Sequence, residues 1–140
     1  MGETCSTFGV STKAGVIVDA EGLTAWSRRN HTVSDSPHLL VERNDHIVTV
    51  TFNRPEAKNA FDLEVLVRLW DAWQMIDEDP EIRCAILTGA GGDFCAGSDL
   101  KQMHGNNEGN PWFERFKEDP DLHWKAMLRH YQLKKPLIAA

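Results

Sequence analysis

A regular alternation of apolar and polar residues begins near residue 38 and predicts a pair of strands. The runs HLLVER (38–43) and HIVTVTFN (46–53) are rich in strand-forming residues. They flank Asn44 and Asp45, which suit a tight hairpin turn. In the second run Val48, Val50 and Phe52 share one face, and Pro55 then prevents further ladder pairing. We therefore expect an antiparallel hairpin with one apolar face.

The next segment changes from a two-residue to a helical period. Asp62 is a suitable N-cap, and Phe61 and Leu66 have the spacing of a hydrophobic staple. An apolar stripe at helical spacing follows, made of Leu66, Leu69, Trp70, Trp73 and Ile76. The pattern predicts a helix over 62–79, ended by Pro80, with both tryptophans in the core.

The rest of the chain predicts a parallel sheet and therefore an α/β fold. CAILTGA (84–90) is a continuous apolar run, typical of a strand covered on both faces, and it completes a β-α-β unit. We then expect a short helix to about His104, a polar break, a longer helix from about Trp112 to Gln132, and the start of another buried strand at PLIAA (136–140).

Charge and composition exclude several functional classes. The net charge is −6 and no basic stripe is present, so we expect neither nucleic-acid binding nor attraction to an anionic membrane surface. The longest early apolar run, AGVIV (14–18), is too short for a membrane span or an export signal. Residues 1–36 lack sustained periodicity, which predicts a disordered extension, with a partner-binding segment as the alternative. We place the domain at residues 37–140.

The three cysteines indicate a cytoplasmic protein with reduced thiols. Cys5, Cys84 and Cys95 are odd in number and lack the CxxC or Cys/His spacing of a zinc site. We therefore expect neither a disulfide framework nor a bound metal.

The turn FCAGSDL (94–100) carries the candidate chemistry. It follows the carboxyl end of the predicted parallel strand, where open α/β folds collect their ligands. At a helix start, the backbone N–H of Ser98, presented after Gly97, would point at an anion or a polarised carbonyl. The pattern fits half of an oxyanion hole, and it also fits an ordinary turn capped by Asp99.

Three segments in order carry a resemblance to a known family. FNRPEAKNAF (52–61), AILTGAGGDFCAGSDLKQM (85–103) and KKPLIAA (134–140) resemble the enoyl-CoA hydratase/isomerase family, also called the crotonase family. The resemblance implies repeated β-β-α units, acyl-CoA thioesters as ligands, and assembly as trimers or dimers of trimers. It also implies that two backbone N–H groups polarise the thioester carbonyl. No separate cofactor is expected, because coenzyme A is part of the substrate.

The resemblance assigns roles to particular positions. Ser98 matches the residue whose backbone N–H is the first oxyanion donor, so its hydroxyl is incidental. The positions that match the coenzyme A site are Ala57, Lys58, Ala60, Ala96, Gly97, Asp99 and Leu100. For Lys58 a phosphate contact and a solvated side chain both remain open. Arg54 is expected to brace its loop, and Cys95 to pack.

The resemblance covers only the N-terminal part of such a domain. The second oxyanion donor and the catalytic acids would lie beyond Ala140, which leaves open whether this chain is an enzyme. In a complete homologue we expect hydration of a 2-enoyl-CoA. Isomerase, hydrolase, decarboxylase and dehalogenase reactions share the same visible features, and a noncatalytic coenzyme A-binding or assembly module is the alternative. We expect the chain alone to be inactive, and either aggregated or loosely packed.

Overall fold

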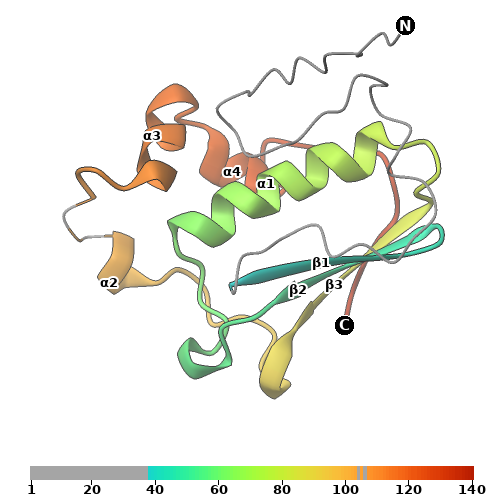
Figure 1. Ribbon diagram of the computed structural model, residues 1–140, viewed down its shortest axis with the longest axis horizontal. Coiled ribbons are helices and arrows are strands. Elements are labelled where there is room, and N and C mark those ends of the chain that lie inside the picture. Colours follow the sequence, from blue (N-terminus) through green and yellow to red (C-terminus); the bar gives the residue numbers. More distant parts are fainter. Residues whose placement is uncertain (1–37, 104, 106) are drawn as a thin grey trace, which may run out of the picture.

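A four-stranded sheet forms the centre of the protein. The computed structural model describes residues 38–103, 105 and 107–140, so the predicted extension 1–36 lies outside the described residues. The strands are β1 (Leu39–Asn44), β2 (Ile47–Phe52), β3 (Cys84–Gly89) and β4 (Leu137–Ala139), in that order across the sheet. β1 and β2 are antiparallel, whereas β2, β3 and β4 run parallel (Figure 1). The mixed α/β architecture and its opening β-β-α unit confirm the predicted fold class.

The predicted hairpin forms, but its two-residue loop lies one residue later than predicted, at Asp45 and His46, because Asn44 still belongs to β1 and pairs with Ile47. β1 and β2 pair from Leu39 opposite Phe52 to Asn44 opposite Ile47. Asp45 takes a positive φ of 53°, which Asp tolerates better than most residues. Val48, Val50 and Phe52 are buried on one face, as their alternation predicts.

Helix α1 (Leu63–Glu78) covers that apolar face (Figure 1). It begins at Asp62, whose side chain accepts a hydrogen bond from Val65 N–H, so the predicted N-cap is confirmed. Trp73 is 1% exposed and donates its indole N–H to the carbonyl of Ala126 at 2.8 Å. The tryptophan is therefore a core residue that also fixes the C-terminal segment.

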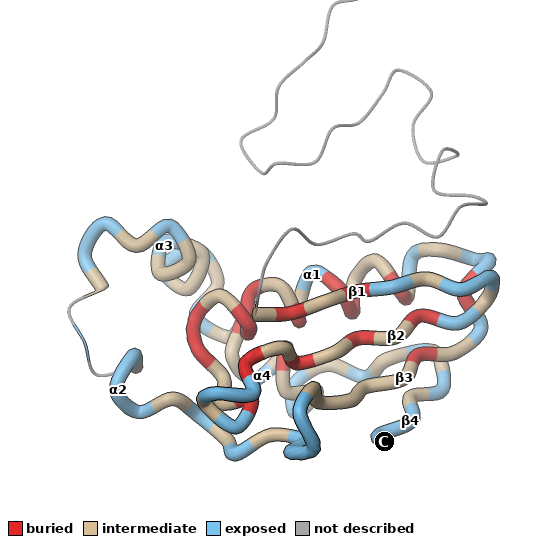
Figure 2. Tube along the Cα trace, turned by 60° about the horizontal axis from the view of Figure 1, so that its bottom comes forward, coloured by how far each residue is buried: buried red, intermediate tan, exposed pale blue. Residues whose placement is uncertain are grey.

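The opposite face of the sheet is less covered than its apolar sequence predicts. On β3 only Ala85 is buried, and the residues of the other face remain partly accessible (Figure 2). Ile47 and Ile138 are 41% and 53% exposed. The expectation that β3 is covered on both faces is wrong for the described chain, because its helices pack against one face only.

Beyond β3 the helices are shorter than predicted. α2 (Leu100–Met103) agrees with the expected short helix. The single helix expected over 112–132 is wrong, because the structure has α3 (Pro111–Glu118) and α4 (Leu122–Ala126) with Pro120 between them. Proline offers no N–H and excludes the helical conformation for the preceding residue. Over the described residues, no helix is both long and apolar enough to cross a membrane.

Candidate functional site

Two loops meet at the carboxyl ends of the parallel strands β2 and β3. Phe52 and Gly89 are paired at these ends. The short 3-10 helices η1 (Pro55–Ala57) and η2 (Ala90–Gly92) follow, and they lie side by side at one end of the sheet (Figure 1). The structure thus brings the two sequence motifs together, although β3 and β2 are separated by a whole helix in the chain.

A short parallel bridge joins the two loops next to Ser98. Phe61 pairs with Ser98 as an isolated bridge. Phe61 N–H donates to the carbonyl of Gly97 at 2.8 Å, and Asp99 N–H donates to the carbonyl of Phe61 at 2.7 Å. In this arrangement the backbone N–H of Ser98 is directed away from Phe61, because alternate residues of an extended segment present their polar groups to opposite sides.

The backbone N–H groups around Ser98 are otherwise occupied. Ala96 N–H donates to the carbonyl of Lys58 at 3.0 Å, and Gly97 N–H donates to the sulfur of Cys95 at 3.3 Å. Asp99 N–H is used in the bridge. For Ser98 N–H we find no acceptor among the described residues, and the residue is exposed. Because Ser98 is exposed, its N–H is accessible to water and equally to a ligand.

Arg54 connects the two loops through its side chain. The side chain is 9% exposed, and it donates to the carbonyl of Ala60 at 2.8 Å and to Asp99 at 3.2 Å. Burial alone would raise the pKa of Asp99, but the hydrogen bonds from Arg54 and from the N–H groups of residues 101 and 102 outweigh it and lower the pKa. The Asp99 carboxylate, predicted to lie along coenzyme A, thus has structural partners on the protein.

Asn59 fixes the same junction, and sequence reasoning missed it. Its side chain is fully enclosed, donates to the carbonyls of Ala90 and Asp93, and accepts from Arg54 N–H at 2.9 Å. Its φ is 56°. Asparagine tolerates this left-handed conformation better than most residues. An Asn within a predicted loop is therefore a signal for it that the sequence already contained.

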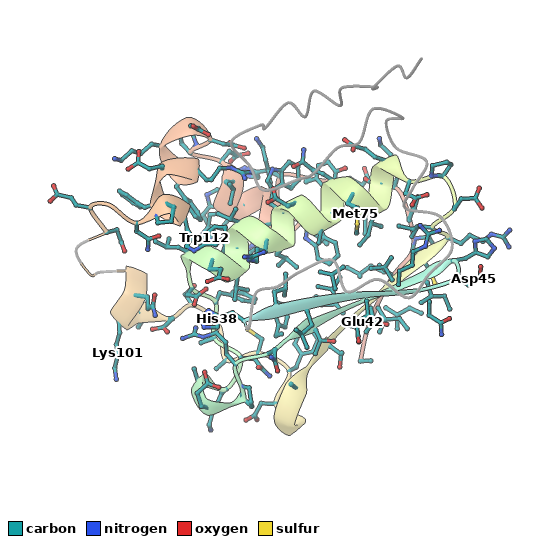
Figure 3. All side chains as sticks on the ribbon, in the orientation of Figure 1. His38, Glu42, Asp45, Met75, Lys101 and Trp112 are labelled. Atoms are coloured by element: carbon teal, nitrogen blue, oxygen red, sulfur yellow. The ribbon has the colours of Figure 1, made fainter. Side chains whose placement is uncertain are left out.

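The remaining predicted positions line the open side of the same loops. Ala57 and Ala60 are half-buried, whereas Lys58 and Ala96 are exposed. Gly97 has a φ of 99°, a conformation that favours glycine. Leu100 is 67% exposed, an unusual position for a large apolar side chain. Figure 3 shows Lys101 on α2 pointing away from the sheet.

The cysteine in the turn has a packing environment. Burial raises the pKa of the Cys95 thiol more than the hydrogen bond from Gly97 lowers it, so the neutral thiol is favoured. Cys84 is likewise a free thiol. Within the described ranges, no group of three or more His, Cys, Asp and Glu side chains has the arrangement of a metal site.

Comparisons with known proteins agree with this arrangement. A family model described as enoyl-CoA hydratase/isomerase matches residues 42–140. Enoyl-CoA hydratase EchA19 of Mycobacterium tuberculosis is 47% identical over 109 residues, covering 78% of this chain and 40% of the relative. (E)-benzylidenesuccinyl-CoA hydratase of Thauera aromatica is 38% identical, covering 73% of this chain and 38% of the relative.

Solved structures show the same likeness. The crystal structure of an enoyl-CoA hydratase from M. tuberculosis H37Rv matches with a TM-score of 0.58 and 38% identity, covering 75% of this chain and 38% of that chain. The chain therefore spans about 40% of the length of the curated relatives it matches. The family model covers most of the described residues, and its match extends from β1 to β4. On these grounds the chain belongs to the enoyl-CoA hydratase/isomerase family.

Proposed function

We propose that this chain forms part of an enzyme acting on acyl-CoA thioesters, in which the backbone N–H of Ser98 is one donor of the oxyanion hole. The observation that carries the proposal is that Ser98 N–H has no acceptor among the described residues, while the N–H groups of Ala96, Gly97 and Asp99 are bonded. When negative charge develops on a thioester oxygen, a donor already held in place stabilises it without reorganisation.

The loops around Ser98 have the chemistry that a coenzyme A ester needs. Leu100 offers an exposed apolar surface beside the donor, and Lys58 offers an exposed ammonium group on the neighbouring loop. Apolar contacts suit the pantetheine and acyl parts, while the ammonium suits a phosphate. We propose that both side chains contact the coenzyme A part of the substrate.

The reaction proposed for a complete protein is addition of water to a 2-enoyl-CoA. Two of the matched relatives are hydratases by name, which supports this choice within the family. A second N–H donor and the acid and base groups would come from the part of the domain that this chain does not span. We further propose that the complete protein acts in the cytoplasm as a homotrimer or hexamer and needs no separate cofactor.

The test separates the backbone of Ser98 from its side chain. Residues 1–140 are joined to the segment of M. tuberculosis EchA19 that follows the matched region. Crotonyl-CoA hydration by this chimera is then measured. Ser98→Ala keeps the N–H and should leave kcat within about twofold. Ser98→Pro removes the N–H and should lower kcat by about 10²-fold, the scale of one oxyanion contact.

Amide protection of Phe61 in Ser98→Pro serves as the control for folding of the loops, since its N–H bonds to Gly97. A large loss of turnover in Ser98→Ala would assign the chemistry to the hydroxyl and contradict the proposal. Full activity in Ser98→Pro would contradict it as well.

A further inference from the structure

We propose that Arg54 is a positioning residue that sets the direction of the Ser98 N–H by joining the starts of α1 and α2, without itself contacting substrate. Its effect on turnover depends on the oxyanion role proposed above, whereas its effect on the loops does not.

The guanidinium of Arg54 lies between two helix caps. One nitrogen, Nη1, donates to the carbonyl of Ala60 at 2.8 Å and lies 3.4 Å from Asp62 Oδ2. The other, Nη2, lies 3.2 Å from Asp99 Oδ2. One planar group therefore contacts both loops and both aspartates.

Each aspartate turns one oxygen to a helix start and the other to Arg54, and in Asp62 the second oxygen also lies 2.8 Å from His38 Nδ1. Asp62 Oδ1 accepts from Val65 N–H at 2.8 Å, at the start of α1. Asp99 Oδ1 accepts from Lys101 N–H at 3.2 Å and Gln102 N–H at 3.4 Å, at the start of α2. In both cases Oδ2 is the atom that faces the guanidinium, so Arg54 connects the two helix starts directly.

The two aspartates that Arg54 connects are the immediate neighbours of the two bridge residues. Phe61 precedes Asp62 and Ser98 precedes Asp99, and these two inner residues form the isolated parallel pair. Two backbone hydrogen bonds alone would hold this pair, which is a short ladder. Arg54 holds the residue that follows each bridge residue. This restricts rotation of the backbone at Asp99 and thereby sets the direction of the Ser98 N–H.

Two features argue for positioning and against a substrate contact. The Arg54 side chain is 9% exposed, and its two terminal nitrogens already face protein oxygens. Arginine also suits this positioning role, because its planar guanidinium presents two nitrogens in fixed directions, whereas lysine has a single charged nitrogen. Lysine at this position should keep the charge and lose the connection between the helix starts.

The chain contains a matched control at the other end of the sheet. Arg43 is also 9% exposed and pairs with Asp79, which is 17% exposed, compared with 16% for Asp99. Arg43→Lys therefore removes a guanidinium of the same burial, paired with one aspartate and one carbonyl, far from Ser98. A general loss of stability would appear in both variants, whereas positioning of the bridge predicts a difference.

The first measurement is amide hydrogen exchange in the full chain. Arg54→Lys should speed exchange of the Phe61 and Asp99 amides at least about tenfold relative to the amides of β2, because the bridge opens locally. Arg43→Lys should leave that ratio unchanged. Asp99→Asn, which removes the charge at the other side of the pair, should reproduce the Arg54→Lys result. Equal bridge protection in all variants, or the same change in Arg43→Lys, overturns the proposal.

The second measurement is turnover in the chimera described above. Arg54→Lys should lower kcat about tenfold or more with KM unchanged, since misplacing a site group by about 1 Å can cost as much as 10²-fold. Arg43→Lys should retain the parent kcat and KM. A rise in KM with unchanged kcat would indicate a substrate contact and overturn positioning.

The two proposals fail in different ways. If Ser98→Pro remains active while Arg54→Lys opens the bridge, the oxyanion role is wrong and the link between helix starts stands. If Ser98→Pro is inactive and Arg54→Lys keeps full kcat, the positioning role is wrong and the oxyanion role stands.

Discussion

The two ends of the sheet are built around similar buried Arg–Asp pairs, yet they differ in how completely their polar groups are paired. Figure 3 marks them by His38 and Lys101 at one end and Asp45 at the other. At the amino end of β3, Arg43 Nε donates to the carbonyl of Asp45 at 2.8 Å, and Nη1 donates to Asp79 at 2.6 Å. At the carboxyl end, Arg54 Nε is buried and has no partner within the part of the chain that the structure describes.

The backbone hydrogen bonds differ between the two ends of the sheet in the same way. At the amino end, the N–H groups of Arg83 and Cys84 both donate to the carbonyl of His46. At the carboxyl end, Ser98 N–H has no acceptor among the described residues. Ser98 is exposed, so its N–H can bond to water, whereas an unpaired buried donor such as Arg54 Nε costs about 1–3 kcal/mol. The difference teaches that the polar groups compared at the amino end bond within the fold, whereas the carboxyl end leaves an exposed backbone donor, Ser98 N–H, accessible from outside.

The largest expected effect concerns Gly89, where β3 enters the site loops. A Cβ at this position would lie closer than 3.0 Å to the backbone oxygens of Asp93 and Phe94. Gly89→Ala should therefore lower the free energy of unfolding by about 3 kcal/mol, the upper range for overpacking. Cys84→Ala, at the amino end of the same strand, should cost less than about 1 kcal/mol. Urea unfolding measures both, and equal losses would remove the distinction between the ends.

A smaller effect is expected for Asn59, which bonds three backbone groups of the site loops. Asn59→Ala leaves these groups unpaired and should cost about 2 kcal/mol in thermal or urea unfolding. Asn59→Gly should cost less, because glycine accepts the φ of 56° without strain. Asn44→Ala, an exposed asparagine at the other end, should change stability by less than about 0.5 kcal/mol. A loss at Asn44 as large as that at Asn59 would contradict the comparison.

The smallest effect concerns Tyr131, which packs on α1 toward the amino ends of the parallel strands. Its hydroxyl donates to Asp77, which also accepts from Lys134 N–H at 3.0 Å. The hydrogen bond to Asp77, followed by burial and nearby negative charge, raises the pKa of Tyr131 to about 12. The chain has one tyrosine, so its ultraviolet titration is unambiguous.

The sign of the pH effect follows from this raised pKa. The Tyr131 contribution to stability should be complete below about pH 10, the ordinary tyrosine value, and lost as pH rises toward 12. Wild-type protein should therefore exceed Tyr131→Phe in stability at neutral pH, and the two should converge in alkali. The urea-unfolded chain, titrating near pH 10, is the control. Native titration near pH 10 would show that the Asp77 bond is absent.

Local signals account for the parts of the fold that the sequence predicts correctly. The hairpin signal and the Asp62 cap each act within a few residues. The cap is confirmed, and the hairpin forms with its loop one residue later than predicted, at Asp45 and His46. The helix expected over 112–132 was wrong because its apolar pattern continues across Pro120, and the proline outweighs the pattern. The incomplete cover of β3 depends on what packs against it, which no local pattern contains.

The candidate site was predictable in outline. The turn at Ser98 has a strand before it and a helix after it, so its place at the strand ends followed from sequence, and the structure agrees. The contact between Arg54 and Asp99 joins residues 45 positions apart, and no spacing rule indicates it. The free Ser98 N–H likewise follows from the bonds of its neighbours, which only the three-dimensional arrangement reveals.

Lys58 has a consequence for engineering the chain. It holds a φ of 51°, next to Asn59 at 56°, so two successive residues adopt a conformation natural to glycine. A side chain there costs on the order of 1 kcal/mol. Glycine at position 58 would relieve this backbone strain at the cost of a more flexible unfolded chain, and the same change would remove the ammonium group that we propose contacts coenzyme A. If Lys58 contacts coenzyme A as proposed, a search for heat-resistant variants of this chain should measure affinity for coenzyme A esters in parallel at this position.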